Sequence, residues 1–179
     1  MKEKNIENAL VKILRKKSPI DLAQISITNT NYPNISSFAD LCKHHSFDIW
    51  QDDSRWNENP SFMNEIIGGM TPDIVIRSTL SGENRIIIEV KAQVKLGYST
   101  TSSQIIRYFL HLLATSKSEP INGKPDITRA ILLAAPDEWF DNPSTGSAWN
   151  YFFNQYKDLA NDFSVVLGEI RIPADLIFI

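Results

Sequence analysis

The sequence has little of what marks secreted or membrane proteins. Its single cysteine, Cys42, excludes a disulfide within the chain and gives no sign of an oxidising compartment. We expect Cys42 in the core, because a free cysteine behaves as a small hydrophobe. No apolar run approaches the roughly 20 residues that cross a bilayer. The first residues carry charges where a signal peptide needs an apolar centre, so we expect a cytoplasmic protein without a membrane partner.

The chain also lacks an excess of positive charge. Its 18 Lys and Arg are outnumbered by 21 Asp and Glu, for a formal net charge of −3. A protein that binds nucleic acid through its overall charge is usually basic. A polyanionic partner would therefore have to be held by a local patch, by bound cations or with help from another protein.

What remains has the composition of an ordinary globular domain. Of the 179 residues, 42% are hydrophobic and 22% are charged, enough for one domain over residues 1–179 with a real core. We predict helices over residues 4–17, 37–45, 104–116 and 147–162, the first closed by Pro19. We predict strands over residues 74–77, 85–94, 128–135, 163–172 and 174–179, and a loop with a short extended piece over 47–60.

This order of elements favours an α/β (α+β) protein, with a mixed sheet flanked by helices. The turn sequence Ser81-Gly82-Glu83-Asn84 separates two of the strands, so the segments 74–77 and 85–94 are expected to form a hairpin. The dipeptides Pro125-Asp126 and Pro136-Asp137 are interpreted as ordinary turns.

Charged residues recur on one face of the long second strand. Side chains alternate between the faces of a strand, so Arg85, Glu89 and Lys91 share a face with Lys95, while the opposite face is apolar. The hairpin can bring Asp73 beside Glu89 and Lys91. We therefore expect two carboxylates and one ammonium to converge at one end of the sheet.

Such a convergence suits phosphodiester hydrolysis. Carboxylate oxygens are the hard ligands that Mg²⁺ prefers. A bound cation polarises a phosphoryl oxygen and lowers the pKa of a water molecule. The Lys91 ammonium could orient that water or stabilise negative charge in the transition state.

At these residues the sequence resembles the PD-(D/E)XK nuclease superfamily. Pro72-Asp73 matches the first half of its motif and Glu89-Val90-Lys91 the second, and Gln104 to Tyr108 resembles the Q-x-x-x-Y motif of the RecB-like branch. The resemblance implies a restriction-endonuclease-like fold and hydrolysis of DNA with Mg²⁺ or Mn²⁺, leaving 5′-phosphate and 3′-hydroxyl ends. It implies that Asp73, Glu89 and the Val90 carbonyl bind the metal and that Lys91 is the catalytic lysine.

The resemblance also implies further site residues. An acid from the first helix often adds a metal ligand in such nucleases, a role that Glu7 matches by position and for which Glu65 is the rival. Gln104, Arg107 and Tyr108 form a stripe with His111 on one helix face, which favours contacts with phosphate or bases. A capping box from Thr101 to Gln104 would explain Gln104 without nucleic acid.

Other interpretations stay open. The charged strand could be a half-exposed face that pairs its charges with a neighbour. The protein could keep a nuclease fold without cutting and bind a partner in a defence or anti-defence system. It could also be a nuclease subunit that works in a homodimer or with a helicase. DNA is the expected substrate, and RNA is not excluded.

Overall fold

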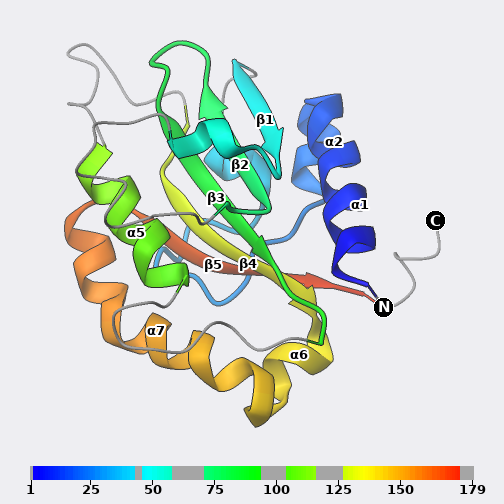
Figure 1. Ribbon diagram of the computed structural model, residues 1–179, viewed down its shortest axis with the longest axis vertical. Helices are drawn as coiled ribbons and strands as arrows, with labels where there is room; N and C mark the ends of the chain where they lie inside the picture. The colour runs from blue at the N-terminus through cyan, green and yellow to red at the C-terminus, as the bar shows by residue number, and fades with distance from the viewer. Residues whose placement is uncertain (1, 43–45, 58–70, 94–103, 116–126, 174–179) are drawn as a thin grey trace.

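The computed structural model describes residues 2–42, 46–57, 71–93, 104–115 and 127–173. Five strands form one mixed sheet in the order β1-β2-β3-β4-β5, and helices lie against both faces of it (Figure 1). The predicted class, a mixed sheet flanked by helices, is therefore confirmed.

The sheet has an antiparallel half and a parallel half. The strands are β1 (Phe47–Gln51), β2 (Ile74–Ser78), β3 (Asn84–Val90), β4 (Ala130–Pro136) and β5 (Val166–Ile172). Strands β1, β2 and β3 are antiparallel neighbours, whereas β3, β4 and β5 run parallel. The predicted hairpin is confirmed, with Ile74 opposite Ile88. Gly82 adopts a left-handed φ of 73° in its turn, a conformation that costs glycine little.

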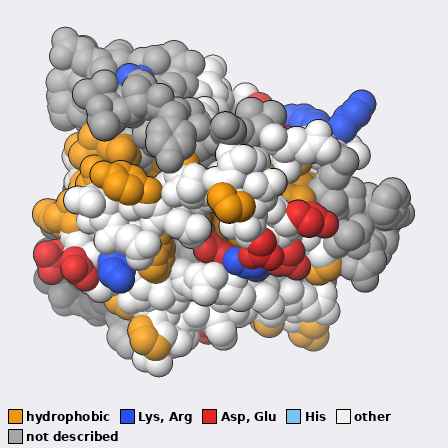
Figure 2. All heavy atoms as spheres, turned by 90° about the horizontal axis from the view of Figure 1, so that it is seen from below, with side chains coloured by type: hydrophobic (Ala, Val, Ile, Leu, Met, Phe, Trp, Pro, Cys, Tyr) orange, Lys and Arg blue, Asp and Glu red, His pale blue; other side chains and the backbone are white. Residues whose placement is uncertain are grey.

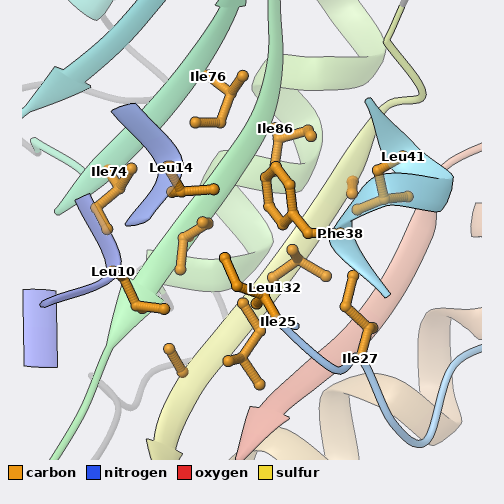
Figure 3. Close-up of a cluster of buried hydrophobic side chains, with 14 of the residues drawn as sticks. Leu10, Leu14, Ile25, Ile27, Phe38, Leu41, Ile74, Ile76, Ile86 and Leu132 are labelled. Carbon is orange, nitrogen blue, oxygen red and sulfur yellow. The ribbon is translucent and has the colours of Figure 1, made fainter. Parts of the chain in front are cut away.

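One face of the sheet is covered by α1 (Glu3–Lys16), α2 (Pro19–Ala23) and α3 (Phe38–Leu41). The apolar residues of α1 recur at helical spacing, so Leu10 and Leu14 point together into the core. They pack with Ile74, Ile86 and other sheet residues in the cluster shown in Figure 3. Cys42 is buried in this cluster, as expected.

The opposite face is covered by α5 (Gln104–Thr115), α6 (Asp137–Asp141) and α7 (Pro143–Asp162). Val75 and Ile87 from the sheet pack there against Phe109 and Trp149. Strand β3 therefore lies between two apolar layers. Any charged side chain on β3 has to be accommodated inside the protein.

Several predicted boundaries are wrong. Pro19 does not simply close the first helix. It starts α2, where its missing N–H has no cost. The helix predicted over 37–45 ends at Leu41 and begins with a capping box between Ser37 and Asp40. Pro136-Asp137 is not an isolated turn, because Pro136 caps the start of α6.

The predicted loop over 47–60 contains more structure than expected, namely β1 and a 3₁₀ helix over Ser54–Asn57. The strand predicted over 85–94 ends at Val90, although the Lys91 N–H still bonds to the Ala134 carbonyl at 2.9 Å. The strand predicted over 174–179 and the dipeptide Pro125-Asp126 lie outside the described residues. Within the described ranges, no helix is both long and apolar enough to cross a membrane.

Candidate metal centre

Asp73 and Glu89 lie at the end of the hairpin where β2 begins and β3 ends. The register that sets Ile74 opposite Ile88 sets Asp73 opposite Glu89 one position further. Asp73 Oδ2 accepts a hydrogen bond from the Val90 N–H at 2.8 Å. Glu89 Oε1 lies 3.2 Å from Lys91 Nζ. The structure thus brings the three predicted catalytic residues together.

The charged face of β3 is not half-exposed. Arg85 and Glu89 are each 3% exposed and Lys91 is 8% exposed. This contradicts the interpretation of a surface strand, because helices cover both faces of the sheet. Arg85 forms a buried ion pair with Glu83 at 2.8 Å, whereas Glu89 lies next to a second acid.

Glu89 is the most perturbed of these acids. Burial, followed by the charge of Asp73, raises its pKa to about 8, against the opposing effect of Lys91. Its second oxygen, Oε2, is buried and has no hydrogen-bond partner within the described part of the protein. The pKa of Asp73 is also raised by burial, and the Val90 N–H and Lys91 oppose this shift.

Glu7 joins the site from α1. The ligand oxygens of Glu7, Asp52 and Asp73 all lie within 4.8 Å of one another. Burial raises the pKa of Glu7 to about 7, and a hydrogen bond with Asp52 adds to the shift. At Asp52 burial favours the neutral carboxyl, but hydrogen bonds with Glu7 and Lys4 outweigh it and lower the pKa. The rival ligand Glu65 lies outside the described residues.

Sequence analysis missed Asp52. It directly follows β1, and its N–H bonds to the Asp73 carbonyl at 3.0 Å, so strand pairing carries Asp52 next to Asp73. Its φ of 49° is unusual for a residue with a side chain. The signal in the sequence was the acidic pair Asp52-Asp53 after a short alternating segment. The sequence did not show which strand that segment pairs with.

The Q-x-x-x-Y residues lie on α5, which begins at Gln104. Arg107 is half-buried, but Tyr108 and His111 are fully buried, so the predicted stripe does not form an accessible surface. Tyr108 packs edge-on against Trp56, with ring centres 5.5 Å apart. Thr101 of the alternative capping box lies outside the described residues.

Tyr108 instead approaches the acids from inside the protein. Its hydroxyl is buried without a hydrogen-bond partner among the described residues. Burial, and then the charges of Glu89 and Asp73, raise its pKa. Contact of Gln104, Arg107 or Tyr108 with nucleic acid stays a prediction.

The donor set fits a hard divalent cation. Asp73 and Glu89 offer carboxylate oxygens, one of which, Glu89 Oε2, is buried and has no partner within the described ranges. Two carboxylates held side by side repel each other unless a cation relieves them. Carboxylate oxygens of this kind suit hard cations such as Mg²⁺, Ca²⁺ and Mn²⁺.

A cavity of about 470 Å³ is lined by Ala92 and Gln93, which directly follow Lys91 in the chain, and by residues of α6 and α7 that include Trp139, Ser144 and Thr145. Its lining, among the described residues, does not include Asp73, Glu89 or Lys91. This volume is in the range of ligand pockets.

Comparison with known proteins identifies no relative. No protein-family model, no curated protein and no solved structure matches this chain.

Proposed function

We propose that this protein is a metal-dependent nuclease of the PD-(D/E)XK type, with a restriction-endonuclease-like fold, that hydrolyses phosphodiester bonds in DNA. The observation that carries the proposal is the meeting of Asp73, Glu89 and Lys91 at one end of β2 and β3, with a buried glutamate oxygen that has no partner among the described residues. Residues that only stabilise a fold are seldom left in such a state.

Each residue has a separate role in this proposal. Asp73, Glu89 and the Val90 carbonyl would hold Mg²⁺ or Mn²⁺. The bound ion would supply Lewis acidity and lower the pKa of a water molecule. The Val90 N–H fixes the orientation of Asp73 at 2.8 Å. Lys91, held by Glu89 at 3.2 Å, would direct its ammonium at the water or at the charge that grows on the phosphate.

The reaction consumes one water molecule. The attacking water releases a proton to solvent and its oxygen forms a bond to phosphorus, while the bond from phosphorus to the 3′ oxygen breaks. The 3′ oxygen leaves with a proton taken from solvent, which gives 5′-phosphate and 3′-hydroxyl ends. Lys91 acts by position and charge.

The described part of the face drawn in Figure 2 offers no broad basic surface for DNA. Acidic and basic side chains stand there in small groups. We infer that bound cations, local contacts near Arg107 or a partner subunit hold the substrate. The cavity lined by Ala92 and Gln93, which follow Lys91 in the chain, has the volume to hold part of a nucleotide.

The test is cleavage of end-labelled DNA, and of RNA of the same sequence, with Mg²⁺ or Mn²⁺. We expect Lys91→Ala to lower the cleavage rate by about a hundredfold or more. Lys12→Ala, which removes an exposed lysine of α1, is the matched control and should cleave normally. Equal rates for Lys91→Ala and the wild type would refute the proposal.

A protein that cuts neither nucleic acid would favour the alternative of a silent nuclease fold that binds a partner. Calorimetry with Mn²⁺ separates the two cases. A silent protein that has lost its metal site would show no heat of binding.

A further inference from the structure

Lys4 on α1 is an ammonium placed among the acids. Its Nζ lies 3.0 Å from Glu7 Oε1 and also forms an ion pair with Asp52. The Lys4 side chain is 56% exposed and that of Asp52 is 43% exposed, whereas that of Glu7 is 4% exposed. Lys4 thus reaches from solvent to the open side of the group formed by Glu7, Asp52 and Asp73.

Two of these carboxylates are already oriented by the protein. Gln51 Nε2 donates to Glu7 Oε1 at 2.9 Å, and the Val90 N–H donates to Asp73 at 2.8 Å. Asp52 is tied by its own N–H to the Asp73 carbonyl. The oxygens lie within 4.8 Å of one another, and ligand atoms on opposite sides of Mg²⁺ stand about 4 Å apart.

A separate observation points to a cation here. Glu89 lies beside Asp73, and its Oε2 is buried without a hydrogen-bond partner among the described residues. The Lys91 ammonium contacts Glu89 through Oε1. The ion pairs found for Lys4 are with Glu7 and Asp52. More positive charge near Asp73 would therefore stabilise the group.

We propose that Asp52 completes a divalent-cation site with Glu7 and Asp73, and that the Lys4 ammonium occupies this site until a cation displaces it. The inference rests on the metal chemistry of the proposed function and adds a ligand and a competitor to it. An exposed lysine is a suitable competitor, because its flexible stem can swing into solvent and its ion pairs there are weak.

The experiment is calorimetric titration of the full chain with Mn²⁺, for the wild type, Lys4→Met and Asp52→Asn. We expect Lys4→Met to bind Mn²⁺ about fivefold more tightly, the upper end of what exposed ion pairs contribute. We expect Asp52→Asn to bind about tenfold more weakly. Lys12→Met on the same helix is the control for loss of a positive charge and should match the wild type. Circular dichroism checks that each variant is folded.

A second titration separates this inference from the nuclease proposal. In a Glu89→Gln background, cleavage should be lost, but adding Lys4→Met should still tighten Mn²⁺ binding. The inference is overturned if Lys4→Met changes the Mn²⁺ affinity of neither the wild type nor Glu89→Gln. It is also overturned if Asp52→Asn leaves the Mn²⁺ affinity of the wild type unchanged. If the Lys4 effect is present but the wild type cuts no nucleic acid, only the proposed function fails.

Discussion

Glu89 and Glu169 are two buried glutamates at the same level of one sheet, and their surroundings are opposite. Glu89 on β3 and Glu169 on β5 both pair with Leu133 on β4. They are 3% and 4% exposed. Glu169 accepts from Asn29 and Arg171 through Oε1, each at 3.0 Å, and from the Trp149 indole through Oε2 at 3.1 Å. Glu89 has Lys91 on one oxygen, and its other oxygen has no hydrogen-bond partner in the part of the chain that the structure describes.

The two residues show how a carboxylate buried to stabilise the fold differs from one buried in a candidate functional site. Glu169 joins α7, the loop at Asn29 and β5 through a complete set of donors, which is how a buried carboxylate stabilises a fold. Glu89 faces Asp73, a second acid, and its pKa rises to about 8. Without a cation this place favours the neutral carboxyl, because a charge there would cost stability, and proteins accept such strained groups chiefly at functional sites.

The largest expected effect is on cleavage. Glu89→Gln should lower the rate of DNA cleavage by about a thousandfold, because an amide is a poor ligand for Mg²⁺. Glu169→Gln lies at the same level of the sheet but outside the candidate site, so the rate per folded molecule should stay near that of the wild type. Rates on labelled DNA at saturating Mg²⁺ measure both. Equal losses in the two variants would break the comparison.

The stabilities of the same variants should move in opposite directions. The folded-state pKa of Glu89 is raised from 4.5 to about 8, so the acid contributes stability below pH 4.5 and loses it as the pH rises. Without divalent metal, Glu89→Gln should therefore be more stable than the wild type by about 3 kcal/mol at pH 7, and about equal to it near pH 4.

Glu169→Gln should instead lose about 3 kcal/mol, since Arg171 and Trp149 lose a charged partner. Urea unfolding of both variants in a chelating buffer measures the two changes. A destabilised Glu89→Gln protein at pH 7 would show that Glu89 is structural after all.

The smallest expected effect is on the pH dependence of stability, and it comes from His111, a buried histidine. Burial lowers its pKa from 6.5 to about 4, so its neutral form is favoured in the folded protein. The stability it contributes is present above pH 6.5 and is lost as the pH falls toward 4. Between pH 7 and 5 the wild type should lose about 2 kcal/mol more than His111→Gln. Unfolding curves at the two pH values test this, and parallel losses would contradict it.

Local pattern was enough for the longer helices, the hairpin and the motif residues, but it missed α2 and α6 and left β1 inside a predicted loop. Alternation along β3 placed Glu89 and Lys91 together, and the turn at Gly82 brought Asp73 beside them. Asp52 could not be found in this way, because nothing in its neighbourhood indicates that β1 pairs with β2. The burial of Tyr108 was missed for a similar reason, since a helix with polar residues on one face is usually solvated on that face.

By itself, the sequence determined the longer helices, the hairpin and the acids and lysine at its end, because helical and strand periodicity and turn residues act over short distances. Only the tertiary structure decided how deeply those charged side chains are buried and which groups lie beside them. Helices packed on both faces of the sheet bury Glu89 and Lys91, and the pairing of β1 with β2 brings Asp52 to Asp73. Desolvation and strand pairing depend on residues far apart in the chain, and these two effects turn a charged strand into a candidate metal centre.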